Sequence, residues 1–315
     1  MNKEALKGFK DLVQRKLQFV IDELKKIVGS SSIELLQMNK GKKGRPFRYS
    51  ETEIVNASAF RFLMKQGLRQ TTVLVKNLTG KCTSYSQLCR RMASLGIKWI
   101  INKTERKGRF LAIDGSGIST DYRGDYRSSK YKVRQRFYKL HALVDAETKE
   151  IVDYRLTSDK VGDNKKFLPL VRESASRGDT VYADGAYDSK DNFDYLDKNG
   201  ILPGIRIRKN FSTKQKGSSA RWKAVIEQFG INSRRLKGRM HFLAADEIVL
   251  DEDRIRYYQD KWKEKSGYGR RTAVERFYST FKALFGGHAS SRKWNNLRKE
   301  MLIKCLTYNK LLKLT

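Results

Sequence analysis

The sequence is poor in the residue types that mark several classes of protein. Its three cysteines, Cys82, Cys89 and Cys305, are odd in number and lack CxxC spacing, which argues against a disulfide framework and against a zinc site. Three histidines give little material for histidine-based metal or triad chemistry. No stretch approaches the roughly 18 consecutive apolar residues of a membrane helix, and the N-terminus lacks the apolar segment of a signal peptide. We therefore expect a soluble cytoplasmic protein with no membrane partner.

Acidic residues are also scarce. The chain has 67 Lys and Arg against 34 Asp and Glu, a formal net charge of +33. Such an excess destabilises the compact state through self-repulsion unless a polyanion offsets it. The hydrophobic content of 39% is nevertheless enough for one large core or two modest ones in 315 residues. These features predict a globular protein whose partner is nucleic acid.

The first part of the chain, residues 1–108, is predicted to be all-α. Apolar residues at helical spacing predict a helix over residues 3–28, and Ser50 with Glu53 has the form of a capping box that starts a second helix. Two short helical patterns then flank the turn TGKCT. They fit a helix-turn-helix that presents Arg90 and Arg91 to DNA. A plain helical bundle fits almost as well, because short helix pairs are common.

From Arg109 onward the pattern changes to strands alternating with helices. Three strands come first, then a helix, a fourth strand, a second helix and a fifth strand. The segments in chain order are RFLAIDGSG, the two halves of QRFYKLHALVDAETKEIVDYRLTS, NKKFLPLVRESASR, TVYADGAY, DSKDNFDYLDKNG and ILPGIRIR. This order predicts an α/β fold, a ribonuclease H-like catalytic core with a mixed five-stranded sheet and helices. The core is expected over residues 109–288, followed by a C-terminal helix over 289–315.

One narrow stripe of a predicted helix, in the segment YGRRTAVERFYSTFK, carries four polar residues. Arg271, Glu275 and Lys282 follow Tyr268 at offsets of 3, 7 and 14 residues, which fall on one side of a helix that turns about 100° per residue. The opposite side is apolar and is expected to pack on a core, through Ala273, Val274, Phe277, Phe281, Leu284 and Phe285. The helix would hold one acid rigidly between cations, which suits a metal and phosphate site. A surface ladder of ion pairs is the alternative.

Two further acids stand where apolar strands are predicted to end. Asp114 and Asp184 are each followed at once by glycine, an arrangement that points a carboxylate out of a sheet edge. Either one alone is explained as well by an aspartate that opens a turn. Together with Glu275, however, three acids from two strands and a docked helix can hold two divalent metal ions. Phosphoryl transfer is the reaction class that this set indicates.

With these residues the chain resembles the insertion-sequence DDE transposases, in the group with a tyrosine-arginine-glutamate-lysine signature. The signature matches Tyr268, Arg271, Glu275 and Lys282, and the preceding acids match in AIDGSG and YADGAYDS. The resemblance implies Asp114, Asp184 and Glu275 as catalytic ligands of two Mg²⁺ or Mn²⁺ ions. It implies that Arg271 and Lys282 contact phosphates of the transposon ends and that Tyr268 contacts DNA backbone or base. It also implies a homodimer on double-stranded DNA, and a protein associated with the nucleoid of a prokaryotic cell.

Two basic stretches are the predicted path for DNA. The run from Asp121 to Lys139 combines seven Arg or Lys with aromatic rings and includes Arg134 and Arg136; a charged hairpin edge is the alternative. Residues 201–240 hold eleven Arg or Lys and one acid, which is not typical of an ordinary solvated face. This second stretch begins a basic insertion expected over about 209–260. Its candidate contacts are Arg208, Lys209, Arg234 and Arg235.

The sequence therefore predicts a DNA transposase. It is expected to bind the terminal inverted repeats of its own element, cleave the ends and join the 3′ hydroxyls to target DNA. Two alternatives stay open. One is a nuclease of the same fold that cuts without joining, and the other is a transposase-derived DNA-binding protein that has lost its chemistry.

Overall fold

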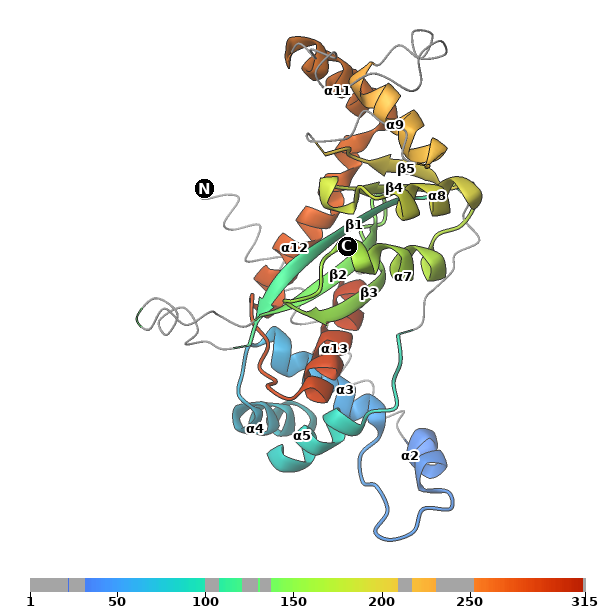
Figure 1. Ribbon diagram of the computed structural model, residues 1–315. Coiled ribbons are helices and arrows are strands. Elements are labelled where there is room, and N and C mark those ends of the chain that lie inside the picture. Colours follow the sequence, from blue (N-terminus) through green and yellow to red (C-terminus); the bar gives the residue numbers. More distant parts are fainter. Residues whose placement is uncertain are drawn as a thin grey trace. The chain divides into compact units, whose positions relative to one another are not determined.

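The structure is a computed structural model that describes residues 22, 32–99, 108–120, 130, 137–208, 217–230 and 252–313 (Figure 1). The chain divides into two compact units. The first comprises Met1–Trp99, Ser119–Gln135 and Phe281–Thr315, and the second comprises Ile100–Ile118 and Arg136–Thr280. Several predictions lie outside the described residues: the helix over residues 3–28, and the candidate DNA contacts Arg134, Arg136, Lys209, Arg234 and Arg235.

The described part of the first unit is helical. Its helices are α2 (Ser32–Asn39), α3 (Glu51–Leu63), α4 (Leu68–Thr79), α5 (Tyr85–Ser94) and α13 (Trp294–Leu312). The predicted capping box is present: the Ser50 hydroxyl accepts from the Glu53 amide at 3.1 Å, and the Glu53 carboxylate accepts from the Ser50 amide at 2.7 Å. Leu88, Leu297 and Met301 are fully buried, so the core of this unit joins its N-terminal helices to α13.

A five-stranded mixed sheet forms the centre of the second unit. Its strands are β1 (Phe110–Ser119), β2 (Phe137–Asp145), β3 (Ile151–Ser158), β4 (Thr180–Ala183) and β5 (Leu202–Ile205), in the order β3-β2-β1-β4-β5. β2 and β3 are antiparallel, whereas β4 runs parallel to both β1 and β5. The order and directions confirm the predicted α/β, ribonuclease H-like core.

Helices cover both faces of this sheet (Figure 1). On one face α7 (Asn164–Ser174), α8 (Lys190–Lys198) and α9 (Ser219–Phe229) join the strands in a single apolar cluster that includes Leu111, Ile113, Val181 and Ala183. The other face meets α12 (Thr272–Phe285), where the Tyr278 hydroxyl donates to the carbonyl oxygens of Asp114 and Leu140 at 2.8 and 2.6 Å. The described part of this unit also contains α11 (Glu252–Ser266) and two short 3-10 helices, η1 (Gly185–Tyr187) and η2 (Tyr268–Arg271).

Two local predictions differ from the structure. The first strand does not end at Asp114 but continues to Ser119. Pairing explains this, because β2 extends alongside and the Phe137 ring lies against Gly117, so tertiary packing overrides the low strand propensity of glycine. The four signature residues also do not share one helix. Tyr268 and Arg271 lie in η2, a separate 3-10 turn before α12. The Tyr268 hydroxyl donates to the Ala183 carbonyl and its ring packs on Trp262, so tertiary contacts hold this turn against β4 and α11.

The predicted apolar side of the signature helix is confirmed. Val274, Phe277, Phe281 and Phe285 are at most 3% exposed, and Ala273 is 9% exposed. Leu284 is half-buried. Among the helices in the described ranges, none is long and apolar enough to cross a membrane.

Candidate functional site

Asp114 lies on β1 and Asp184 directly follows the parallel strand β4, at matching positions along the two segments. The register of β1 and β4 aligns Phe110 with Thr180 and Ala112 with Tyr182, and each aspartate follows in step. Side chains alternate between the faces of a strand, so both aspartates lie on the face opposite the cluster of Ile113 and Ala183. Neighbouring strands are about 4.8 Å apart. The fold therefore brings the two predicted acids together on the face that α12 covers.

The environment of Asp114 disfavours its negative charge. Burial raises the pKa of this carboxyl to about 6, against a hydrogen bond from the Gly115 amide that lowers it. The negative charge of Asp184 raises it further, the Arg271 cation lowers it, and Asp163 raises it. The Gly115 amide donates to Asp114 Oδ1 at 2.7 Å. Burial and the neighbouring charge of Asp184 both disfavour the ionised form of Asp114. A bound cation would therefore stabilise the two carboxylates in their charged state.

This pKa predicts a pH-dependent effect of removing the charge. The folded pKa of Asp114, about 6, lies above the value of about 3.9 for an unfolded chain. The raised pKa means that the protonated carboxyl of Asp114 stabilises the folded protein. This stabilisation is fully present below pH 4 and is lost as the pH rises through 6. Asp114→Asn is expected to raise the free energy of unfolding of metal-free protein by about 1 kcal/mol at pH 8, relative to its effect at pH 4.

Urea unfolding in the presence of a chelator at the two pH values measures this difference. Asp197→Asn, at an exposed position on α8, is the control and should show the same small effect at both. A pH-independent effect of Asp114→Asn would contradict the assigned environment.

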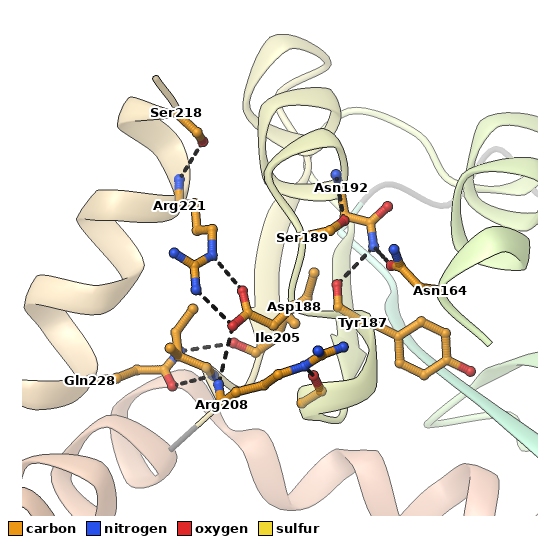
Figure 2. A network of polar contacts seen from close by, with 12 residues as sticks. Asn164, Tyr187, Asp188, Ser189, Asn192, Ile205, Arg208, Ser218, Arg221 and Gln228 are labelled. Carbon is orange, nitrogen blue, oxygen red and sulfur yellow. Dashed lines mark hydrogen bonds and ion pairs between the residues drawn. The ribbon is translucent and has the colours of Figure 1, made fainter. Parts of the chain in front are cut away.

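A dense set of hydrogen bonds fixes the loop that carries Asp184. Asp184 Oδ1 accepts from the Ala186 amide at 2.8 Å and so caps η1. Asp188, whose side chain is 1% exposed, accepts from Arg221 Nε and Nη2 of α9 at 2.6 and 2.9 Å (Figure 2). The side-chain amide of Asn192 donates to the Tyr187 carbonyl at 2.8 Å and so fixes the last residue of η1. Sequence reasoning missed these residues, although an acid four positions after Asp184 was a visible signal.

Glu275 lies in the first turn of α12, where it forms an ion pair with Arg271. Its side chain is 48% exposed and that of Arg271 is 21% exposed. The charge of Arg271 acts on Asp114 as well, so one cation lies in the electrostatic reach of both acids. Lys282 is half-buried in the last turn of α12, within the first unit.

The oxygen donors of this site suit Mg²⁺ or Mn²⁺, which prefer carboxylates, and the destabilised charge of Asp114 adds to that fit. Across the described ranges, however, no three His, Cys, Asp or Glu side chains are grouped so that they could hold a metal ion. The structure thus places the two aspartates near each other, but it does not bring Glu275 close enough to form a three-carboxylate metal site with them.

Tyr268 is largely buried rather than presented at the surface. Its hydroxyl donates to the Ala183 carbonyl at 3.2 Å, and its ring lies 5.0 Å from that of Trp262 between centroids. Tyr268 therefore connects η2, and with it Arg271, to the end of β4 beside Asp184.

A third acid near the aspartates, Asp163, was not predicted. Lys139 donates to its Oδ1 at 3.1 Å, and the buried His141 Nδ1 lies 3.6 Å from the same oxygen. A Cβ on Gly115 would come within 2.9 Å of Asp163 Oδ1, so only glycine fits beside Asp114 without displacing this group. Burial lowers the pKa of His141 to about 4, which keeps its ring neutral at neutral pH.

The two helix-turn-helix candidates differ in their surroundings. Arg90 on α5 is exposed. Arg91 is half-buried, donates to the Tyr49 carbonyl, and stacks 4.7 Å from the centroid of the Phe47 ring. Arg90 is therefore open to a partner, while the described contacts of Arg91 are made within the first unit.

Comparisons with known proteins match nearly the whole sequence. The profile of a family described as "Transposase DDE domain" matches residues 105–310, and a second profile of the same description matches residues 13–121. The first match alone covers more than half of the chain and includes Asp114, Asp184 and Glu275.

Two solved structures are similar at low identity. A piggyBac transposase synaptic complex with hairpin DNA shares 10% identity, with 94% of this chain and 71% of that chain covered and a TM-score of 0.41. A Mos1 mariner paired end complex with Mn shares 12% identity, with 78% and 81% covered and a TM-score of 0.24.

Proposed function

The chain belongs to the DDE transposase family, and from that premise we propose that it is an insertion-sequence transposase of the group with the tyrosine-arginine-glutamate-lysine signature. In this proposal it binds the terminal inverted repeats of its element, cleaves the ends and joins the freed 3′ hydroxyls to target DNA. The observation that carries the proposal is the proximity of Asp114 on β1 to Asp184 at the end of the adjacent parallel strand β4, in the unit that also carries Glu275.

Asp114, Asp184 and Glu275 are the residues that would hold two Mg²⁺ or Mn²⁺ ions. Such ions supply an activated water or hydroxyl nucleophile and stabilise the leaving oxygen of a phosphodiester. The protein contributes orientation. Asp184 is fixed by the Ala186 amide, Asp114 by the Gly115 amide, and Glu275 by its ion pair with Arg271. Glu275 would hold the metal together with the two aspartates, and Arg271, its ion-pair partner, would then be available to a DNA phosphate.

DNA contacts are proposed for cations of both units. Arg271 and Lys282 would bind phosphates of the transposon end, and Arg90 on α5 would contact DNA from the first unit. Tyr268 holds η2 against the end of β4 through its hydrogen bond to Ala183. In this proposal it supports DNA binding by positioning the residues next to it in η2. The net charge of +33 supports double-stranded DNA as the partner. We also propose a homodimer on paired ends, and a nucleoid-associated protein in the prokaryotic cytoplasm.

A strand-transfer assay with precleaved ends tests the proposed function. Purified full-length protein is mixed with duplexes that carry a recessed or blunt inverted-repeat end, supercoiled target plasmid and Mg²⁺. The expected product is plasmid joined covalently to the labelled 3′ end, and it should depend on the metal. The repeats are taken from the DNA that brackets the gene.

The outcome separates the alternatives. Cleaved ends without joined product would replace the proposal with a nuclease of the same fold. Specific binding of the repeats with neither product in Mg²⁺ or Mn²⁺ would replace it with a DNA-binding protein derived from a transposase.

A further inference from the structure

The basic segment after β5 contains an arginine that contacts the loop of Asp184. From its contacts we infer that Arg208 is a positioning residue for Asp184, acting through the single peptide group between Gly185 and Ala186. This inference rests on the proposed function, because it assigns Asp184 as a metal ligand. It goes beyond that function by giving a structural task to a residue that the sequence indicated only as a DNA contact.

The contacts form one continuous chain of donors and acceptors. Arg208 Nε donates to the Gly185 carbonyl at 2.6 Å, and Arg208 Nη2 donates to the Ala186 carbonyl at 2.9 Å. The Ala186 amide, in the same peptide group as the Gly185 carbonyl, donates to Asp184 Oδ1 at 2.8 Å. One planar peptide therefore receives the guanidinium on its oxygen and bonds the carboxylate through its nitrogen.

This arrangement has two physical consequences for Asp184. A cation on the carbonyl oxygen polarises the peptide and strengthens the hydrogen bond that its N–H makes. That bond engages Oδ1 and fixes the rotation of the carboxylate, which leaves Oδ2 as the oxygen free of the η1 cap. Groups that orient a ligand in this way commonly change metal affinity by about 10- to 100-fold.

Arg208 is itself anchored by the neighbouring acid. Its backbone amide donates to Asp188 Oδ2 at 3.2 Å, and the same carboxylate receives both Arg221 contacts from α9 (Figure 2). One residue earlier, the Ile207 amide donates to Gln228 Oε1 at 2.9 Å, also on α9. Because Asp188 is buried and satisfied on both oxygens, the segment that carries Arg208 has a fixed place relative to the Asp184 loop.

These contacts connect α9 with the catalytic acid. The sequence placed α9 within a basic stretch predicted to follow DNA, yet its Arg221 and the preceding Arg208 point to the loop of Asp184. Arg208 remains exposed, so a phosphate contact is a competing role that an experiment must separate.

The experiment measures Mn²⁺ binding and DNA binding independently, with full-length protein. Mn²⁺ affinity is followed by the electron paramagnetic resonance signal of the free ion, without DNA. Duplex affinity is followed by fluorescence anisotropy, without metal. The variants are Arg208→Met, Arg208→Lys and Asp184→Ala. The matched control is Arg172→Met, which removes an exposed arginine that stacks on Tyr195 of α8 in the same unit.

Arg208→Met is expected to weaken Mn²⁺ binding by about 10-fold or more, while its duplex affinity matches that of Arg172→Met. Arg208→Lys keeps the charge but lacks the fork that reaches two carbonyls, so its Mn²⁺ affinity should lie between wild type and Arg208→Met. Asp184→Ala should lose the binding. Thermal unfolding of each variant establishes that the protein compared is folded.

Three outcomes would overturn the inference or its premise. Wild-type Mn²⁺ affinity in Arg208→Met, with binding lost in Asp184→Ala, refutes the role of Arg208 and leaves the proposed function standing. The same Mn²⁺ result with duplex affinity below that of Arg172→Met would make Arg208 a DNA contact instead. Unchanged Mn²⁺ affinity in Asp184→Ala would remove Asp184 from the metal site, and with it the proposed chemistry.

Discussion

Asp184→Asn and Asp114→Asn are each expected to reduce metal-dependent cleavage of the transposon ends by about 1,000-fold or more, because a catalytic metal ion contributes several kcal/mol to the transition state. Asparagine has nearly the size of aspartate, so packing beside β1 and β4 should be kept. What is lost is one negative charge of a pair that the register of the two strands places side by side.

Cleavage of a labelled inverted-repeat duplex in Mg²⁺ measures this loss, and anisotropy of the same duplex measures DNA binding. Binding should stay within about twofold of wild type, because the cations proposed to contact phosphates are unchanged. Asp197→Asn on the exposed side of α8 is the control and should cleave normally. Either catalytic-site variant cleaving at the wild-type rate would refute the assignment of that aspartate.

The second large effect concerns stability of the first unit. Glu300→Ala is expected to lower the free energy of unfolding by about 3–5 kcal/mol, since removing one partner leaves a buried charge uncompensated. Glu300 and Lys304 pair at 2.8 Å on α13 with side-chain exposures of 0% and 2%. The same carboxylate accepts from the amides of Ser290 and Ser291, both at 2.9 Å, so its loss also frees the segment before α13.

Urea unfolding measures this cost. Asp260→Ala, which breaks an exposed ion pair with Lys263, is the control and should leave the unfolding midpoint nearly unchanged. The double variant Glu300→Met with Lys304→Met should regain most of the stability, because a buried ion pair can be replaced by packed apolar side chains. A Glu300→Ala protein that unfolds at the wild-type midpoint would show that the pair is not needed.

The predictions that held depend on local patterns. Ser50 and Glu53 satisfy each other's amides within three residues, so their sequence alone specifies the start of α3. The apolar spacing of Val274, Phe277 and Phe281 likewise predicts the buried side of α12. The alternation of strands and helices after Arg109 also predicts a mixed five-stranded α/β fold, because parallel strands need helical crossovers.

The predictions that failed or were missing depend on contacts between distant segments. β1 continues past Asp114 because β2 lies alongside it. Tyr268 lies outside the helix of Glu275, in η2, where it contacts the Ala183 carbonyl and the Trp262 ring. Asp163 and Asp188 gained significance only when folding placed them beside Gly115 and Arg221. Composition could not show whether Arg208 faces DNA or the protein.

The sequence by itself determined a basic α/β protein with two aspartates after apolar strand segments and an acid on an amphipathic helix, because charge, periodicity and spacing are local properties of the chain. Only the tertiary structure decided that Asp114 and Asp184 are neighbours and that Glu275 pairs with Arg271. It alone also decided that Arg208 contacts the Asp184 loop. The register of paired strands and the direction of a long side chain depend on packing between segments far apart in sequence, which no local pattern encodes.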